Sequence, residues 1–458
     1  MDYRVEKDLL GEFKIPVGAY WGIHTQRAVE NFPVTGRKVN LSLIKAYCRV
    51  KKASALANQE LKLLEDKKAG AIIRACDEIV EGKFSDQFPV DSLQGGAGTS
   101  TNMNVNEVLA NRAIEFLGGK PGDYKLVDPI EDVNLNQSTN DTYPTALKVA
   151  AIFALRELSP AIASLQGAFQ KKEKEFAKIV KIGRTELQEA VPITLGQEFS
   201  AFAEAFARDR WRTFKCEERL RLVNLGGTAV GTGLTAPRSY IYLVIEILRQ
   251  ETGLGLARGE TVLDQTANSD SLVEVSGILK AHAVNLIKVS KDLRLLNLLG
   301  EIELPELQAG SSIMPGKVNP VMLEAATQAG MQVIANDQII TQACSAASLQ
   351  INEFLPAAAE ALLGSLDILI NINGLLAAHI AGIKADEEKC REYFDRSPGI
   401  ITALLPQIGY ARAQELLAEF KSSGQSNLRE FLSDKLGQDL IDRVFDPYNL
   451  ISLGYDLK

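Results

Sequence analysis

The feature of this sequence that most constrains its fold is a set of three long segments without proline, in which apolar residues recur at helical spacing. The segments cover about residues 272–299, 321–350 and 357–381. Helices of this length suit the core of a bundle better than its periphery. Many of their side chains are small, as at Ala325 and Ala329, and let neighbouring helices approach closely. No part of the sequence sustains the alternation of a β-strand, so we predict an all-α fold.

The pattern of breaks predicts three domains around this core. Residues 1–135 form an N-terminal, mainly helical domain with a loop-rich start, and residues 136–383 form the central long-helix bundle domain. Residues 384–458 form a small C-terminal helical domain, because Pro398 and Gly409 shorten the helical patterns there.

Composition excludes several classes of function. Apolar residues make up 46% of the 458 residues and charged residues 24%, which is enough for a large core. The net charge of −8 argues against nucleic acid or an anionic membrane surface as a partner. The N-terminus is charged and lacks the apolar core of a signal peptide, and no apolar run reaches the roughly 20 residues of a membrane span. Five scattered cysteines indicate a reducing cytoplasm, and three distant histidines show no metal-binding spacing.

Residues 310–320, which join two of the long helices, read Gly-Ser-Ser-Ile-Met-Pro-Gly-Lys-Val-Asn-Pro. Two glycines and two prolines exclude a regular helix or strand, so this is a shaped loop. It carries two hydroxyls, an ammonium and an amide, which are groups that bind substrates or do chemistry. A phosphate-binding loop is rejected, because five residues separate the glycines and Val318 follows Lys317.

Three more clusters of hydroxyl and amide side chains lie at predicted helix ends, in residues 99–104, 138–142 and 184–189. Such residues usually cap helices, but the first cluster has more of them than one cap needs. Helix N-termini with extra hydroxyls bind anions readily. Together with Lys317, the clusters could surround a small dianion.

The helix starts near these clusters follow from the same pattern. We expect helical runs from Leu61 to Gly82 and from Asn106 to Gly118. Another helix should follow Pro144, and Pro160 fits the first turn of the next one.

The loop at 310–320 resembles the signature of the fumarase/aspartase superfamily. Residues 98–107, 137–141 and 183–185 resemble that family's other blocks, in the same order and at family spacing across essentially the whole chain. Within the family, residues 86–100 are more similar to aspartases than to fumarases, which usually show a Thr-Gly-Ser-Gly-Thr-Gln-Ser version. Leu304-Pro305-Glu306-Leu307-Gln308-Ala309 also looks like aspartase.

The resemblance implies a role for each matching residue. Ser311 would be the base that removes the proton from the carbon beside the β-carboxylate, and Lys317 would assist it and bind substrate. Thr99, Ser138, Thr139 and Ser312 would bind the β-carboxylate of the substrate, and Thr185, Lys317 and Asn319 would bind its α-carboxylate. Asn140 would lie near the amino group, and Arg27 would bind a substrate carboxylate. Glu324 would support the site from behind, without touching the substrate. The open alternatives are a turn residue for Ser311, a solvated charge for Lys317, plain caps for Thr99, Ser138 and Thr139, and a structural ion pair for Arg27.

These residue types fit the chemistry. Removing a proton beside a carboxylate gives a doubly charged aci-carboxylate, which needs donors placed where the charge develops. A serine is a poor base in water, so Ser311 must be activated. The cation of Lys317 and the backbone N–H groups of a tight turn would favour its alkoxide.

Two departures from the family stand out. Glu186 occupies a position where relatives have His or Gln. Its carboxylate could pair with a substrate ammonium, exchange a proton with Glu324, or face solvent. The second departure is a loop after Leu296 that lacks the Ser-Gly-Pro-Arg insert usual in relatives.

The resemblance therefore implies the aspartate ammonia-lyase reaction, in which L-aspartate gives fumarate and ammonia reversibly, without a cofactor or a metal ion. It implies a cytoplasmic homotetramer whose central helices form the core and whose sites combine loops from three subunits. The alternatives are a fumarate hydratase or related dicarboxylate lyase, and a catalytically silent structural homologue.

Overall fold

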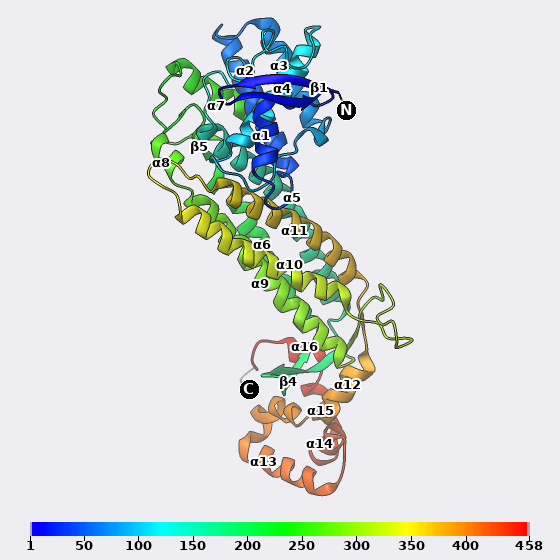
Figure 1. Cartoon of the computed structure of the whole chain (residues 1–458). Helices are drawn as coiled ribbons and strands as arrows, with labels where there is room; N and C mark the ends of the chain where they lie inside the picture. The colour runs from blue at the N-terminus through cyan, green and yellow to red at the C-terminus, as the bar shows by residue number, and fades with distance from the viewer. Residues whose placement is uncertain (1, 456–458) are drawn as a thin grey trace. The chain divides into compact units, whose positions relative to one another are not determined.

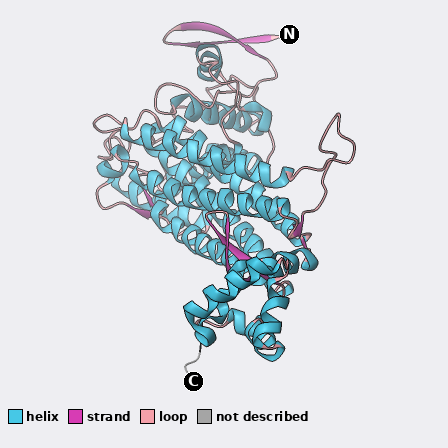
Figure 2. Cartoon of the chain, turned by 90° about the horizontal axis from the view of Figure 1, so that it is seen from below, coloured by secondary structure: helices cyan, strands magenta, loops and turns pink. Residues whose placement is uncertain are grey.

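The computed structural model of the chain describes residues 2–455, and helices dominate it (Figures 1 and 2). The predicted all-α fold is confirmed. The helices are α1 Ile23–Asn31, α2 Leu41–Glu60, α3 Asp66–Val80, α4 Thr99–Phe116, α5 Thr139–Glu175, α6 Leu195–Leu220, α7 Arg238–Thr252, α8 Val262–Ala267, α9 Asp270–Leu298, α10 Val321–Ser345, α11 Leu355–Ala381, α12 Glu387–Arg396, α13 Leu405–Ser423, α14 Leu428–Leu436, α15 Gln438–Val444 and α16 Pro447–Ile451, with the short 3₁₀ helices η1 Ser85–Gln87 and η2 Pro398–Leu404.

The strands form small two-stranded sheets, of which two are hairpins that the sequence pattern did not predict. The strands are β1 Tyr3–Asp8, β2 Gly11–Pro16, β3 Val180–Thr185, β4 Gln188–Thr194, β5 Leu222–Val223, β6 Ala257–Arg258, β7 Ile302–Glu303 and β8 Lys384–Ala385. In β1 the buried residue is Glu6, whereas Tyr3 and Val5 are exposed. Because its apolar side chains do not mark the buried face, hydrophobic alternation could not reveal this strand.

The three long helices lie close to their predicted positions as α9, α10 and α11, and they run beside one another in Figure 1. The predicted helix over 321–350 ends earlier, at Ser345, because the chain turns back on itself where Ser348 and Ile351 pair. By length and composition α11 could cross a membrane, but 56% of its most apolar window is buried inside the protein. Its apolar side chains are those of a core helix.

Four predicted helix starts, at Leu61, at Asn106, after Pro144 and at Pro160, were wrong. Helix α3 begins at Asp66, and α4 begins at Thr99 rather than Asn106, directly after Gly98 in a left-handed conformation at φ +89°. A side chain on Gly98 would collide with the Tyr143 ring at 2.1 Å. Helix α5 begins at Thr139 and continues through Pro160 without a new start.

The chain divides into two compact units. The first comprises Met1–Leu158, Arg212–Ala281 and Gln332–Leu369, and the second comprises Ser159–Trp211, His282–Met331 and Ile370–Lys458. Five helices, α5, α6, α9, α10 and α11, contribute residues to both units.

Within the second unit, α9 and α10 pack in close contact. A Cβ on Gly330 would lie 2.7 Å from the Ile287 side chain and 3.0 Å from the Ala283 carbonyl oxygen. Residues of β3, η2 and α12–α15 form a separate apolar cluster in this unit, around Ile182, Phe394 and Leu432.

In the first unit, Pro144 lies inside the second turn of α5, where proline cannot donate a hydrogen bond to the carbonyl oxygen of Asn140. The side-chain amide of Asn224 donates to that oxygen at 2.9 Å instead. The same amide also donates to Thr266 Oγ1, and Asn224 is 1% exposed. Asn224 thus repairs the helix at the end that carries the 138–142 cluster.

We expect Asn224→Ala to lower the free energy of unfolding by about 1–3 kcal/mol, because it leaves a buried carbonyl without a donor. Chemical denaturation and the melting temperature would measure this. Asn268→Ala is the control, because the Asn268 amide is exposed and bonds only to Asp264 at 2.7 Å. Equal stability of the two variants would contradict the repair of α5 by Asn224.

Candidate active site

The loop at 310–320 is closed at its base by two hydrogen bonds. The Gly310 N–H donates to the Lys317 carbonyl oxygen at 2.7 Å, and the Asn319 side-chain amide donates to the Gly310 carbonyl oxygen at 2.8 Å. A Cβ on Gly310 would lie 2.6 Å from the Lys317 oxygen, so this close approach requires glycine. Asn319, predicted to bind substrate, therefore also fixes the shape of the loop.

Ser311 lies at the start of a tight turn within this loop. Its hydroxyl oxygen accepts the backbone N–H of Ile313 at 3.2 Å and that of Met314 at 2.9 Å. Hydrogen bonds donated to an oxygen favour its anionic form. The turn therefore supplies the backbone donors that a serine base needs.

Lys317 is exposed on the same loop. No ion pair of its ammonium occurs within residues 2–455. A hollow of about 430 Å³ lies beside it, lined by Ser311, Met314, Pro315 and residues 306–309, among others. Ser312 and Lys317 are thus exposed on this loop, whereas Ser311 and Asn319 are partly buried.

Thr185 and Glu186 lie at the tip of the β3–β4 hairpin in the same unit as the loop. Thr185 pairs with Gln188, so Glu186 and Leu187 form a two-residue turn, with φ values of +51° and +62°. Both Thr185 and Glu186 are exposed.

Glu324, in the first turn of α10, lies 3.4 Å from the Arg294 guanidinium. Glu186 was expected to pair with a substrate ammonium, to exchange a proton with Glu324, or to face solvent. In this conformation it faces solvent. No hydrogen bond joins Glu186 and Glu324 in the described part of the chain.

Thr99, in the first unit, is the first residue of α4 and is exposed. Its hydroxyl donates to the Gly96 carbonyl oxygen at 2.7 Å. The hydroxyls and amides that follow it lie within the helix, and Asn102 and Asn106 are buried there. Thr99 must exchange its bond to Gly96 if its hydroxyl is to donate to a ligand.

Ser138 caps α5. Its hydroxyl oxygen accepts the Asn140 N–H at 3.2 Å, and its own N–H donates to the Asp141 carboxylate at 3.0 Å. The capping interpretation of Ser138 therefore holds in this conformation, and the hydroxyl hydrogen remains available as a donor. Thr139 follows it and is 8% exposed, whereas the Asn140 amide donates to the Ala229 carbonyl oxygen at 2.7 Å.

Asp141 organises this end of α5, a role that the sequence patterns did not reveal. Its carboxylate is fully buried and accepts three backbone N–H groups, those of Ser138, Gly226 and Thr228. Burial raises the pKa of Asp141 to about 7 despite these bonds. Burial likewise lowers the pKa of Lys51 to about 7, and Asp141 opposes that shift.

Asn134 joins the two helix N-termini of the first unit. Its side-chain oxygen accepts the Lys51 ammonium at 2.9 Å and the amides of Asn102 and Asn106 on α4, each at 3.1 Å. Its own amide donates to the Gln137 carbonyl oxygen, directly before Ser138. The start of α4 and the turn before α5 are therefore held together, which the spacing in sequence could not show.

Arg27 forms an ion pair with Asp8. Two of its nitrogens bond the Asp8 carboxylate, at 2.8 and 2.9 Å, and its guanidinium lies 5.1 Å from the centre of the Phe13 ring. The hydrogen bond from Arg27 lowers the pKa of Asp8. In this conformation Arg27 has the structural ion pair that was the alternative to substrate contact.

The predicted site residues thus form two groups. Thr99, Ser138, Thr139 and Asn140 belong to the first unit, at helix N-termini, and Arg27 belongs to the same unit but lies within α1. The second unit holds Thr185, Glu186, Ser311, Ser312, Lys317, Asn319 and Glu324.

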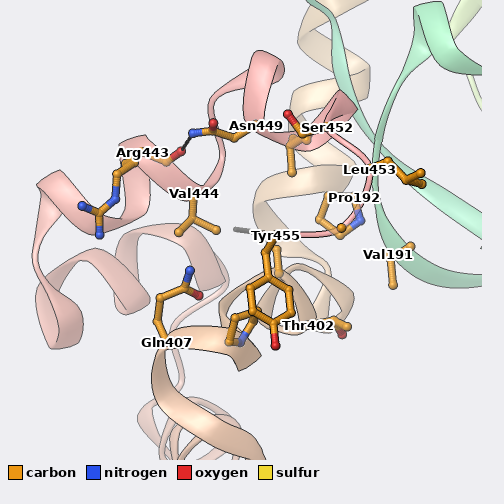
Figure 3. Close-up of a pocket in the computed structure, with 14 residues that line it drawn as sticks. Val191, Pro192, Thr402, Gln407, Arg443, Val444, Asn449, Ser452, Leu453 and Tyr455 are labelled. Atoms are coloured by element: carbon orange, nitrogen blue, oxygen red, sulfur yellow. Dashed lines mark hydrogen bonds between the residues drawn. The ribbon is translucent and has the colours of Figure 1, made fainter. Parts of the chain in front are cut away.

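A separate hollow of about 490 Å³ lies in the second unit between β4, η2, α13, α15 and the residues after α16 (Figure 3). Tyr455, Gln407 and Thr402 line it, and none of the predicted site residues does. Among the described residues, no three or more His, Cys, Asp or Glu side chains gather as metal ligands would.

Known proteins match this chain over almost its whole length. Residues 11–335 match the family described as Lyase. The chain is 45% identical to an aspartate ammonia-lyase from a Bacillus species, over 99% of this chain and 98% of that protein. Two solved structures are similar: a cobalt-bound fumarate lyase:delta crystallin from Brucella melitensis (TM-score 0.94, 44% identity, 99% of this chain and 100% of that one) and a recombinant class II fumarase from Schistosoma mansoni (TM-score 0.92, 31% identity, 98% and 99%). With matches of this extent in both sequence and fold, the chain belongs to the fumarase/aspartase superfamily of lyases.

Proposed function

We propose that this chain is an aspartate ammonia-lyase, which converts L-aspartate reversibly into fumarate and ammonia. The observation that carries this proposal is the similarity along the full length of the chain, at 45% identity to the Bacillus aspartate ammonia-lyase but 31% to the Schistosoma fumarase. The loop at 310–320, with Ser311 held by two backbone donors, supplies the group that begins the reaction.

In the proposed mechanism, Ser311 as an alkoxide removes a proton from the carbon beside the β-carboxylate. The electrons of the broken C–H bond pass into that carboxylate and form a dianionic aci-carboxylate. When this species collapses, the C–N bond breaks and ammonia leaves, which gives fumarate. Proton removal is the difficult step, so donors fixed around the β-carboxylate have the largest effect on the rate.

The residues that would hold the substrate have matching chemistry. Ser312 and the hydroxyls at the N-termini of α4 and α5, which are Thr99, Ser138 and Thr139, would bind the β-carboxylate. Helix N-termini favour an anion because their N–H groups have no partner within the helix. Thr185, Lys317 and Asn319 would hold the α-carboxylate.

The proposed function is tested by following fumarate absorbance with purified protein. We expect fumarate to form from L-aspartate and, in the reverse direction, to disappear only when ammonia is added. Fumarate formation from L-malate without ammonia would identify a hydratase instead. No turnover of either substrate would favour the silent homologue.

Glu186 provides a test of the amino substrate. Its carboxylate could pair with the ammonium of aspartate, so Glu186→Gln should raise the KM for aspartate roughly tenfold or more, as expected for the loss of one charge-assisted contact of about 1.5–3 kcal/mol. The inhibition constant of succinate, which has no amino group, should change much less.

Glutamine keeps the size of the side chain in the hairpin turn, so the comparison isolates its charge. If both constants shift in parallel, or neither moves, Glu186 does not select the amino group. The assignment to aspartate would then rest on the similarity to aspartate ammonia-lyases.

We further propose that the active form is a homotetramer in which sites combine loops from three subunits. Apolar side chains are exposed along the long helices, notably Val284 on α9, Met331 on α10 and Leu375 on α11, each more than 50% exposed. Covering such side chains against other copies of the chain would be favourable. Shared sites would also explain why the two groups of candidate residues belong to different units.

Complementation tests the shared site. We expect Ser138→Ala and Ser311→Ala each to be nearly inactive, and a mixed assembly of the two to regain activity, because some sites then receive both wild-type residues. Size-exclusion chromatography with light scattering would give the mass of each assembly. Mixed tetramers without regained activity would show that each site uses residues of one chain only.

A cytoplasmic location is proposed from the cysteines. All five are free thiols, and Cys48, Cys76, Cys216 and Cys390 are buried. Unpaired thiols suit a reducing compartment.

A further inference from the structure

Glu301 carries a fully buried carboxylate in the second unit, outside the predicted set of site residues. One carboxylate oxygen lies 2.7 Å from the Lys181 ammonium, and the other lies 2.7 Å from the Arg184 guanidinium. Glu301 is 0% exposed, Lys181 1% and Arg184 17%. A single carboxylate thus bridges two positions of β3.

Both ends of this bridge lie next to candidate site residues. Arg184 directly precedes Thr185 and Glu186 at the tip of the hairpin. On the other side, Glu301 directly precedes β7 and begins the segment that leads to Ser311. The ion pairs of Glu301 therefore join β3 of the hairpin to the start of the segment that leads to the 310–320 loop.

The backbone of Glu301 is also fixed. Helix α9 is followed by Gly300 at φ +74°, and the Glu301 N–H donates to the Leu296 carbonyl oxygen at 3.0 Å, which is a Schellman cap. The Glu301 carbonyl oxygen accepts the Asp386 N–H at 3.0 Å. Because of this cap, the chain passes from α9 to Glu301 with little freedom.

The segment beyond Glu301 is held to the same scaffold. In β7, Ile302 and Glu303 pair with Ala385 and Lys384 of β8. The Leu304 N–H then donates to the Asn297 side chain of α9 at 3.3 Å. Residues 302–304 are therefore held in place as well, and the fixed segment extends from Glu301 toward the 310–320 loop.

Stability alone is a weak explanation for such an ion cluster. Taking charges out of water is costly, and apolar side chains of similar volume often give equal or greater stability than a buried ion pair. A carboxylate that bonds two cations does, however, hold its own segment of chain within hydrogen-bonding distance of the segment that carries the cations. That precision matters where loops must align substrate groups.

We propose that Glu301 is a positioning residue, which sets the Thr185 hairpin and the Ser311 loop relative to each other through Arg184 and Lys181. The kinetic consequence rests on the proposed lyase function, whereas the structural one does not. Glu301 does not touch substrate. It acts through the placement of the two segments that would bind the α-carboxylate and remove the proton.

The test compares Glu301→Gln with Asp209→Asn. Asp209 is a second buried carboxylate of the same unit, bonded to His282 and Asn285 on α9, far in sequence from both site segments. Hydrogen–deuterium exchange would be measured on the full-length protein. We expect Glu301→Gln to speed exchange in residues 181–190 and 301–320, and Asp209→Asn to leave both segments at the wild-type rate.

In the lyase assay, Glu301→Gln should lower kcat/KM about a hundredfold, as expected for a misplacement of about 1 Å. Asp209→Asn, examined well below its melting temperature, should stay near wild type. Glu301→Asp should recover only part of the activity, because the shorter side chain cannot reach both cations.

Equal exchange and equal kinetics in the Glu301→Gln and Asp209→Asn proteins would overturn the proposal. If Glu301→Gln does not fold, Arg184→Gln replaces it, because Glu301 then keeps Lys181 and no buried charge is left alone. That variant should still speed exchange in 181–190, and an unchanged rate would overturn the proposal. If the wild-type protein has no lyase activity, the proposed function fails, while the exchange comparison still decides the positioning role.

Discussion

Replacing Ser311 with alanine is expected to lower kcat by about a hundredfold to ten-thousandfold, the range for removal of a general base. The reason is that no other side chain of the 310–320 loop accepts two backbone N–H groups on a hydroxyl oxygen, as Ser311 does from Ile313 and Met314. The rate would be measured by fumarate absorbance at saturating L-aspartate.

The fold should survive this substitution. The Ser311 hydroxyl is partly exposed, so water can take over the two N–H groups, and the melting temperature and the mass of the assembly should match wild type. Ser312→Ala is the neighbouring control, because it removes a predicted binding hydroxyl but not the base, and it should lower kcat less than Ser311→Ala does. Near-normal turnover of the Ser311→Ala protein would remove Ser311 as the base.

The second large effect is expected for Lys317→Ala, which removes a cation from a site for a dianion. Fumarate, succinate and aspartate should each bind at least about thirtyfold more weakly, which corresponds to the lower end of the roughly 2–5 kcal/mol for truncating one partner of a shielded charge pair. Inhibition constants and isothermal titration with succinate would measure the change.

Lys317 is exposed in the single chain, so this prediction also tests whether the assembled site shields it. The matched control is Lys291→Ala, which removes an exposed ammonium from α9 of the same unit. Binding in the wild type should weaken as salt is raised, and the Lys317→Ala protein should respond less. Unchanged succinate inhibition in that variant would exclude Lys317 from carboxylate binding.

Local patterns were sufficient to predict much of the architecture. The long helices α9, α10 and α11 follow from apolar spacing and the absence of proline, which depend on neighbours three and four residues apart. The loop at 310–320 follows from its glycines and prolines in the same way. The pattern also predicted that polar clusters lie at helix ends, which is right for Thr99 and Ser138. It was wrong for residues 184–189, which form the tip of the β3–β4 hairpin.

Local patterns were wrong where a distant residue supplies what the sequence lacks. Pro144 suggested that a helix begins after it, yet α5 starts five residues earlier because the Asn224 amide replaces the missing backbone donor. The β1–β2 hairpin was missed because β1 buries Glu6, which accepts the Ile23 N–H, while its apolar residues Tyr3 and Val5 are exposed. In both cases the partner lies too far along the chain for periodicity to report it.

Local sequence patterns were enough to identify the long helices, the shaped loop at 310–320, and the hydroxyls, amides and lysine of the candidate site. How these groups are held became visible only in the folded chain. It placed two N–H donors on Ser311, joined α4 to the Ser138 turn through Asn134, and paired Glu301 with Lys181 and Arg184 of β3. The physical reason is that periodicity reports local burial, whereas a hydrogen bond or ion pair between distant segments requires that the chain has already folded.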